Sequence, residues 1–203
     1  GTVVRLALID YRAGNLTSVR KALAAVGAEV HTPEAPADLA RASGLLVPGV
    51  GHFDATRVLD EPWRNALRDR VERGIPLLGI CLGLQWLFEG SAEAPDVPGL
   101  GLLAGRCFQL GSRSAAEGAA RIKVPHVGWN ALARRGPSRL LDGVADAAQA
   151  YFTHSFAAPV TAECVATTDH GGAFASVVER GLVFGAQFHP EKSGEVGLTL
   201  LRN

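Results

Sequence analysis

The sequence predicts an α/β fold with a doubly wound, mostly parallel sheet and antiparallel strands added in the C-terminal half. Short apolar runs alternate with amphipathic helical segments through residues 3–89. Glycine-rich turns follow several of these runs, and shorter strand-like segments fill the second half. With 203 residues and 47% hydrophobic composition, we expect a single domain over residues 1–203.

The first half of the chain predicts an alternation of strands and helices. Residues 3–9 form a run of branched apolar residues typical of a buried strand. From Leu16 to Val26 the apolar residues recur at helical spacing, with Asn15 as N-cap and Gly27 as the left-handed residue after the last turn. The further strands are expected at 29–32, 45–47 and 77–80, and the further helices at 62–72 and 82–89.

The second half predicts shorter elements joined by turns. Residues 90–100 and 111–120 are expected to be surface loops, because they are rich in small or turn-forming residues and lack periodicity. A hairpin over 176–184 would add antiparallel strands to the sheet. The expected strands are 102–108, 150–154, 163–167, 174–179 and 182–188, and a helix is expected over 193–201.

Charge and composition exclude several classes of protein. Twenty basic residues balance twenty acidic ones, which argues against nucleic-acid binding. Three cysteines without a CxxC pair predict neither a disulfide framework nor a zinc site, and no metal or cofactor is expected. Without a visible secretion signal or an apolar run long enough to span a bilayer, we expect a cytoplasmic protein that does not bind a membrane.

The most informative motif is GICLG at residues 79–83, where an apolar strand gives way to a helix. It is the thiol form of the nucleophile elbow, in which a sharp strained turn exposes the nucleophile and flanking glycines avoid collisions. Backbone N–H groups at the first helical turn favour the thiolate of Cys81. The alternative is a small cysteine buried at a tight junction.

A thiol nucleophile needs a base and a group that orients the base. His189 and Glu191 follow a predicted strand at positions i and i+2, which point to the same side of an extended segment. Pro190 cannot donate a backbone hydrogen bond, so this segment is expected at a strand end or a sheet edge. A surface turn is the alternative interpretation.

A glycine-rich bend follows the predicted strand 45–47. Glycine permits the backbone conformations that direct successive N–H groups of residues 49–51 toward an oxyanion. A phosphate-binding loop is less consistent, because the bend has no following Lys-Ser/Thr pair and no complete GxGxxG pattern. His52 is expected to be structural. We expect the junction glycines to resist substitution by alanine: Gly14, Gly49, Gly51, Gly79 and Gly83.

Together these motifs resemble the class I (triad) glutamine amidotransferases over nearly the whole chain. Within that superfamily, five blocks look like the glutaminase subunits of imidazole glycerol phosphate synthase: DYRAGNL at 10–16, PGVGHF at 48–53, PHVGWN at 125–130, YFTHSF at 151–156 and QFHPEKS at 187–193. This resemblance implies that Cys81 attacks L-glutamine, His189 transfers protons and Glu191 orients His189. It also implies an oxyanion hole at Val50, Gly51 and Leu82, with the Val50 peptide reorienting when the partner is occupied.

The resemblance further implies a substrate pocket and a docking face. The ammonia would pass to a cyclase subunit with a (βα)8-barrel fold. The implied substrate-binding residues are Gly49, Gln85, Glu93, Ser155 and Phe156, and the implied partner-interface residues are Asn15, Trp129, Tyr151 and Lys192.

Three alternatives remain open from the sequence. The chain could serve another synthase, such as those that make GMP, anthranilate or pyridoxal phosphate. It could be a stand-alone thiol hydrolase or peptidase on the same flavodoxin-like scaffold. It could also be a catalytically silent docking subunit, against which the intact Cys81, His189 and Glu191 argue.

Overall fold

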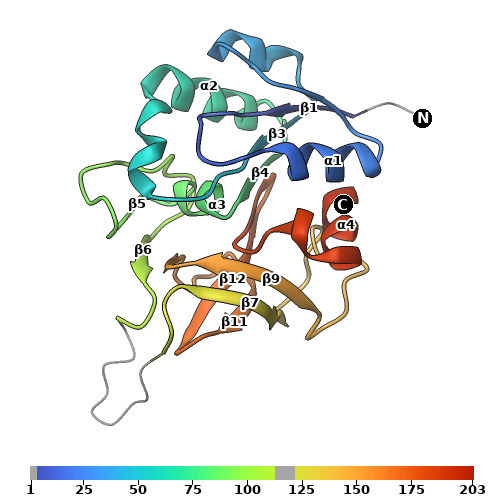
Figure 1. Ribbon diagram of the computed structural model, residues 1–203. Helices are drawn as coiled ribbons and strands as arrows, with labels where there is room; N and C mark the ends of the chain where they lie inside the picture. Colours follow the sequence, from blue (N-terminus) through green and yellow to red (C-terminus); the bar gives the residue numbers. More distant parts are fainter. Residues whose placement is uncertain (1–3, 113–121) are drawn as a thin grey trace.

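A computed structural model describes residues 4–112 and 122–203 of the chain, and its largest sheet has the strand order β2-β1-β3-β4-β13-β12-β11-β8 (Figure 1). The strands of this sheet are β1 (Arg5–Leu8), β2 (Glu29–His31), β3 (Gly44–Val47), β4 (Leu77–Ile80), β8 (Ala133–Arg134), β11 (Cys164–Asp169), β12 (Ala173–Arg180) and β13 (Val183–Ala186). Two smaller sheets contain β5 (Gly90–Ser91), β6 (Arg106–Gln109) and β10 (Phe156–Ala157), and the pair β7 (His126–Ala131) and β9 (Gln149–His154).

The pairing of neighbouring strands changes once across the main sheet, from parallel to antiparallel. From β2 to β13 neighbouring strands run parallel, and from β13 to β8 they run antiparallel. This confirms the predicted α/β class with antiparallel additions in the C-terminal half. The parallel strands end at one edge of the sheet, which is where ligand sites form in open α/β folds.

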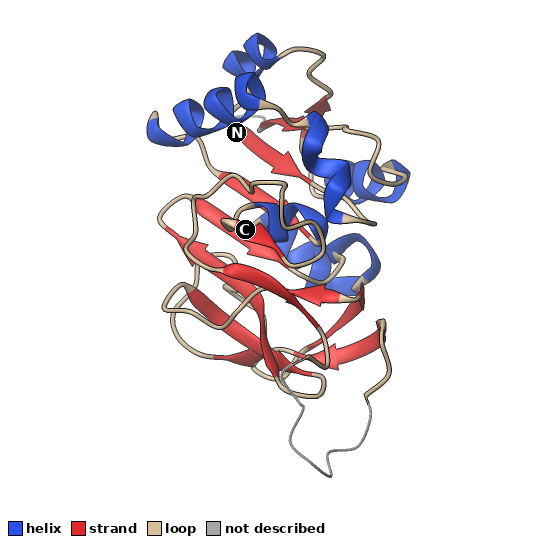
Figure 2. Ribbon diagram, turned by 90° about the vertical axis from the view of Figure 1, so that its left-hand side faces the viewer, coloured by secondary structure: helices blue, strands red, loops and turns tan. Residues whose placement is uncertain are grey.

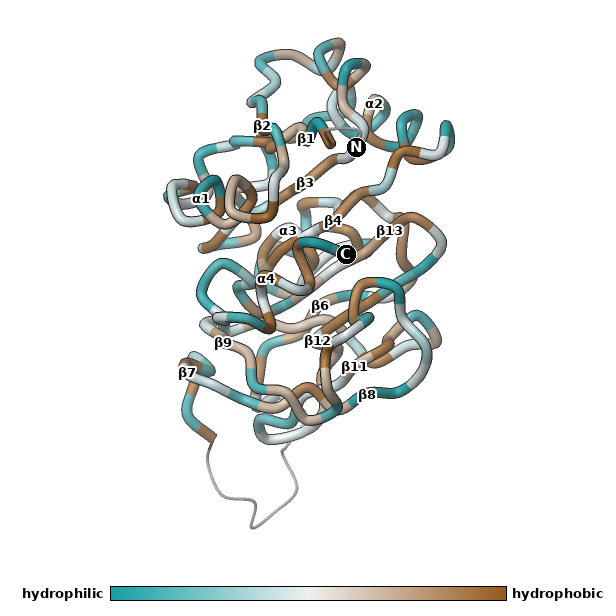
Figure 3. Tube along the Cα trace, turned by 90° about the vertical axis from the view of Figure 1, so that its right-hand side faces the viewer, coloured by the Kyte–Doolittle hydropathy of each residue, from teal (hydrophilic) through white to brown (hydrophobic). Residues whose placement is uncertain are grey.

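Helices cover both faces of the parallel strands (Figure 2). They are α1 (Thr17–Ala25), α2 (Glu61–Glu72), α3 (Leu82–Trp86) and α4 (Gly194–Arg202), with the 3₁₀ helices η1 (Pro36–Arg41), η2 (Phe53–Val58) and η3 (Pro190–Lys192). Alternate strand residues pack on opposite faces: Leu8 and Leu46 join a cluster with α1, whereas Ala7 joins one with α2 and α3. Burial on both sides explains the hydrophobic colour along β3 (Figure 3).

The first half of the chain differs from the prediction mainly at helix ends. The helix predicted over 82–89 ends at Trp86, because the following chain turns back and Leu100 N–H donates to the Trp86 carbonyl. The N-cap of α1 is Leu16 and not Asn15, although the Asn15 side chain accepts from Thr17 N–H at 2.9 Å. Gly27 has the expected left-handed conformation, with φ +85°.

The second half differs more. The strand predicted over 102–108 begins only at Arg106, and the predicted loop 90–100 contributes the short strand β5. Strand β7 was not predicted, although Val127, Trp129 and Ala131 recur at every second position, as expected for a strand. Most of the predicted loop 111–120 lies outside the described residues.

Two junction glycines allow close approach at the end of β3, one to α3 and the other to Tyr11 in the β1–α1 loop. A Cβ atom at Gly83 would lie 1.8 Å from the Val47 carbonyl oxygen, and one at Gly49 would lie 2.0 Å from the Tyr11 hydroxyl. Gly49 also has φ +142°, which a side chain would strain. Both positions therefore require glycine, as expected from the sequence.

We predict that Gly83→Ala destabilises the protein by about 2 kcal/mol or more, because the new methyl group meets backbone that cannot move aside. Gly136→Ala is the matched control, since a Cβ atom there has no atom within 4 Å. Urea unfolding of the two variants measures the difference. Equal free energies of unfolding would contradict the close packing inferred at Gly83.

Candidate active site

Cys81 occupies a strained turn between β4 and α3. Its backbone has φ +55° and ψ −110°, a conformation that non-glycine residues rarely adopt. The side chain is 4% exposed, and Sγ lies 3.9 Å from the Thr153 carbonyl oxygen. The sharp turn expected from the GICLG motif is therefore present, with the thiol at the carboxyl end of a central strand.

His189 and Glu191 form a buried pair after β13. His189 Nδ1 donates to Glu191 Oε1 at 2.8 Å, and the two side chains are 4% and 6% exposed. The proximity was predicted, but its cause was not. Glu191 lies in the 3₁₀ turn of η3 and not on an extended segment, so strand alternation does not bring the two together. The pair lies after a strand end, in the interior of the sheet order and not at its edge.

The surroundings of His189 favour the protonated form of its imidazole. Burial alone lowers the pKa of His189, but interactions with Cys81 and Glu191 outweigh it and raise the pKa to about 9. His189 Nε2 is buried without a hydrogen-bond partner among the described residues. A buried, unpaired imidazole nitrogen beside a thiol is suited to exchanging a proton with a substrate.

A pocket of about 270 Å³ collects residues from distant parts of the chain. It is lined by Val50, Gly51, Cys81, Leu82, Gln85, Glu93, Pro125, Thr153, His154, Ser155 and Phe156. Most of the residues predicted to bind substrate or stabilise an oxyanion therefore meet here. Gly49 does not line the pocket, and it lies under Tyr11 instead.

The backbone N–H groups predicted to form the oxyanion hole are already hydrogen-bonded. Val50 N–H donates to the Ala13 carbonyl at 2.8 Å, and Leu82 N–H donates to the Gly49 carbonyl at 3.0 Å. The Gly49–Val50 peptide thus directs its C=O toward α3 and its N–H away from Cys81. In this conformation neither N–H group is available to an oxyanion in the pocket.

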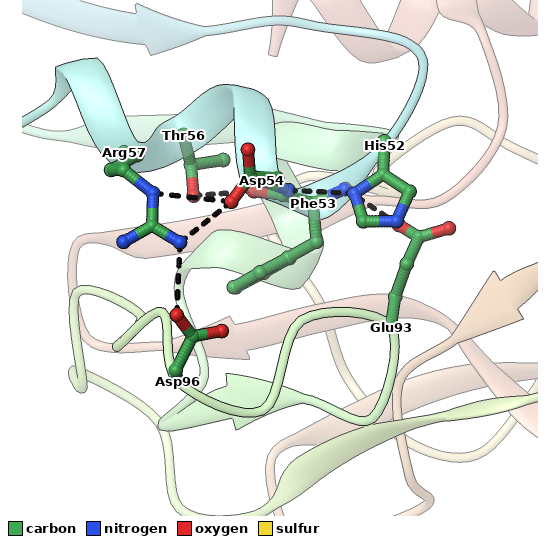
Figure 4. A network of polar contacts seen from close by, with 7 residues as sticks. All are labelled: His52, Phe53, Asp54, Thr56, Arg57, Glu93 and Asp96. Carbon is green, nitrogen blue, oxygen red and sulfur yellow. Dashed lines mark hydrogen bonds and ion pairs between the residues drawn. The ribbon is translucent and has the colours of Figure 1, made fainter.

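Glu93 connects the pocket to the end of the glycine-rich bend (Figure 4). Its Oε1 accepts from Phe53 N–H at 2.6 Å, at the start of η2. Arg57 of η2 pairs with Asp54 and with Asp96, three residues beyond Glu93. His52 Nδ1 accepts from Asp54 N–H, which agrees with the expected structural role of His52.

The predicted interface residues lie outside the pocket. Val127 and Trp129 share one face of β7 and are 55% and 56% exposed. Trp129 is paired with Tyr151 on β9, and their ring centroids are 6.1 Å apart. Asn15 and Lys192 are exposed on the β1–α1 loop and on η3.

Motif analysis did not assign a role to four pocket or contact residues. Each lies within a block already singled out: Pro125, Thr153, His154 and Gln187. Gln187 Nε2 approaches Cys81 Sγ to 3.5 Å. The sequence feature that could have identified Gln187 is its position two residues before His189. Among residues 4–112 and 122–203, no group of three His, Cys, Asp or Glu side chains is placed to hold a metal ion. No helix in the same ranges is long and apolar enough to cross a membrane.

Comparisons with known proteins show the family of this chain. The model of the family "Glutamine amidotransferase class-I" matches residues 7–203. The chain is 48% identical over 200 residues to imidazole glycerol phosphate synthase subunit HisH of Deinococcus radiodurans, covering 97% of this chain and 90% of that protein. It is 45% identical over 202 residues to the protein of the same name from Moorella thermoacetica, covering 98% and 92%. The family resemblance drawn from the motifs is thereby confirmed.

Solved structures with lower identity share the fold. PurLQS from Thermotoga maritima has a TM-score of 0.73 at 20% identity, covering 99% of this chain and 97% of that one. The glutaminase domain of Trypanosoma brucei CTPS has a TM-score of 0.67 at 16% identity, covering 98% and 92%. At these identities the likeness shows the α/β architecture alone.

We predict that the stability of the protein falls as the pH rises through about 9. The folded pKa of His189 lies above the ordinary value of about 6.5, so the stabilisation is complete below about pH 6.5 and is lost through about pH 9. It amounts to about 3 kcal/mol. Urea unfolding over this pH range should show a smaller fall for Glu191→Gln, in which the charged partner is removed. Identical pH dependence in both proteins would contradict the assignment.

Proposed function

The chain belongs to the class-I glutamine amidotransferase family, and from this premise we propose that it is the glutaminase subunit of an imidazole glycerol phosphate synthase. It hydrolyses L-glutamine to glutamate and ammonia, which its partner uses to form imidazole glycerol phosphate and AICAR in histidine biosynthesis. The observation that carries this proposal is the 45–48% identity, over nearly the full chain, to relatives with that name. Cysteines without disulfides suit a reducing compartment such as the cytoplasm.

Catalysis proceeds through a thioester on Cys81. The sulfur attacks the side-chain carboxamide carbon of glutamine, and the carbon–nitrogen bond breaks as His189 gives a proton to the departing ammonia. His189 then takes a proton from water, which attacks the thioester and releases glutamate and the thiolate. Glu191 keeps the proton on His189 Nδ1, so that Nε2 faces the reaction. The 2.8 Å contact between these side chains and the unpaired Nε2 support these roles.

Glutamine binds in the pocket beside Cys81. The half-buried Glu93 carboxylate meets the α-ammonium group, and it already accepts one backbone hydrogen bond at Phe53. Gln85, Ser155 and Phe156 line the space for the side chain. Gly49 contributes by allowing the glycine-rich bend to lie flush against Tyr11.

The Gly49–Val50 peptide controls whether the site is active. Rotation of this peptide releases Leu82 N–H and turns the Val50 N–H toward the pocket, where both stabilise the oxyanion together with Gly51. The two hydrogen bonds that hold the resting conformation support this step. A resting form without an oxyanion hole keeps the subunit from hydrolysing glutamine when no partner is present to use the ammonia.

The partner is a cyclase subunit with a (βα)8-barrel fold, and it docks on the face that bears Trp129, Tyr151, Asn15 and Lys192. Support comes from the exposure of Trp129 and Val127, two large apolar side chains on one face of the β7–β9 pair. Exposed aromatic residues next to a pocket are typical of protein interfaces. Ammonia released at Cys81 leaves on the same side.

We predict slow glutamate release by the isolated chain and a rise of about 100-fold on addition of the cyclase with its nucleotide ligand. The physical reason is that the oxyanion hole forms only after the partner has caused the Gly49–Val50 peptide to rotate. Full activity of the chain alone would contradict control by the Gly49–Val50 peptide and favour a stand-alone hydrolase. Cys81→Ala is the control: it should lose at least about 10³-fold of glutamate release while the cyclase still uses added ammonium.

We further predict that Trp129→Ala weakens binding to the cyclase by about 2 kcal/mol, because a large aromatic anchor is lost from the docking face. Val58→Ala is the matched control, since Val58 is 60% exposed but lies on η2. Titration calorimetry with the purified cyclase measures both affinities. Equal affinities for the two variants would place the interface elsewhere.

A further inference from the structure

We propose that Gln187 is a further catalytic residue, whose carboxamide donates a hydrogen bond to the Cys81 sulfur in an orientation enforced by Gln85. This inference rests on the proposed glutaminase function. The side chains of Gln187 and Gln85 are buried, as is Cys81, with exposures of 0%, 4% and 4%. Gln187 Nε2 lies 3.5 Å from Cys81 Sγ. The side-chain nitrogen and oxygen of glutamine occupy equivalent positions, so the hydrogen-bond partners of each atom must show which is the donor.

The first neighbour is a backbone carbonyl, which can only accept. The Phe156 carbonyl oxygen lies 2.9 Å from the Gln85 side-chain nitrogen. The end of Gln85 that faces Phe156 must therefore be the NH2 group. The opposite orientation would bring two acceptor oxygens together in a buried site, at a large electrostatic cost.

The orientation of Gln85 determines that of Gln187. The same Gln85 nitrogen has a second hydrogen, which it donates to Gln187 Oε1 at 3.1 Å. Gln187 must therefore present its oxygen to Gln85 and its NH2 group to Cys81 Sγ. If the Gln187 amide were reversed, its NH2 group would face the NH2 group of Gln85. Its oxygen, an acceptor, would then face Cys81 Sγ.

A second chain of hydrogen bonds holds the Phe156 carbonyl in place. His154 Nδ1 donates to this oxygen at 2.9 Å, so His154 Nε2 is an acceptor and receives the hydrogen of His126 Nδ1 at 3.0 Å. From the other end, Asn130 Oδ1 accepts from Ala131 N–H, so Asn130 Nδ2 donates to His126 Nε2 at 3.2 Å. The hydrogen bonds at Asn130 and at Phe156 require the same tautomers of His126 and His154. This series of hydrogen bonds therefore holds the Phe156 carbonyl, which sets the orientation of Gln85.

A donor at the sulfur acts at two stages of the reaction. Before attack, Gln187 N–H stabilises negative charge on Sγ, since hydrogen bonds to charged acceptors in buried sites are strong. When the thioester is hydrolysed, the sulfur leaves with its electron pair, and the same N–H stabilises the returning charge. The proton remains on Gln187 Nε2 throughout, so no atom is transferred to or from this side chain.

The test is the rate at which iodoacetamide alkylates Cys81 at neutral pH, because the thiolate is the reacting form. Gln187→Met has a similar length but no donor, and we expect alkylation about tenfold slower. Gln85→Met leaves Gln187 in place but removes the group that orients it, and we expect a loss of severalfold. Gln149→Met changes an exposed glutamine of β9 and should alkylate at the wild-type rate.

The result that overturns the proposal is alkylation of Gln187→Met at the wild-type rate, with thermal melting showing that this variant is folded. If Gln187→Met does not fold, the alkylation rate of Gln85→Met tests the proposal, since Gln187 is unchanged in that variant. A wild-type rate there would then overturn the proposal. Iodoacetamide requires neither glutamine nor a partner. Slow alkylation in the variants together with no glutamate release by the wild-type complex would therefore refute the glutaminase function and leave the hydrogen bond standing.

Discussion

The hydrogen bond from Leu82 N–H to the Gly49 carbonyl joins the helix behind the nucleophile to the glycine-rich bend, and much of the site depends on it. It requires α3 to approach β3 so closely that residue 83 has no room for a Cβ atom. It also determines the direction of the Gly49–Val50 peptide and so keeps the Val50 N–H on Ala13. A typical hydrogen bond contributes about 1 kcal/mol net, so losing two of them costs about 2 kcal/mol. Free energies of this size lie within the range that a bound partner supplies.

The histidines next to the site show how burial and charge compete. Burial lowers the pKa of His154 to about 3 and that of His126 to about 4, and neither has a carboxylate partner to oppose the effect. Their neutral forms match the tautomers that the hydrogen-bond chain requires. His189 is also buried, but Glu191 and Cys81 favour its charged form and reverse the direction of the shift. The shifts differ in direction because only His189 has both Cys81 and the Glu191 carboxylate as partners.

The parts of the site carried by local backbone chemistry were predictable. A cysteine between two glycines at a strand–helix boundary predicts a sharp turn, and Cys81 has φ +55°. The His189–Glu191 contact was also predicted, but from strand alternation, whereas the two side chains meet through the 3₁₀ turn η3, which begins at Pro190. Strand β7 was missed because its pattern is inverted: His126 is buried, whereas the apolar Val127 and Trp129 are exposed.

The sequence by itself determined the order of strands and helices in the parallel half, the strained turn at Cys81 and the glycines at the strand ends, because these follow from periodicity and from the steric limits of single residues. Only the tertiary structure decided the direction of the Gly49–Val50 peptide, the orientation of the Gln85 and Gln187 amides and the proton positions on His126 and His154. Each of these is chosen by hydrogen-bond partners from distant parts of the chain. A polar group in a buried site has no water to satisfy it, so its neighbours determine which way it points.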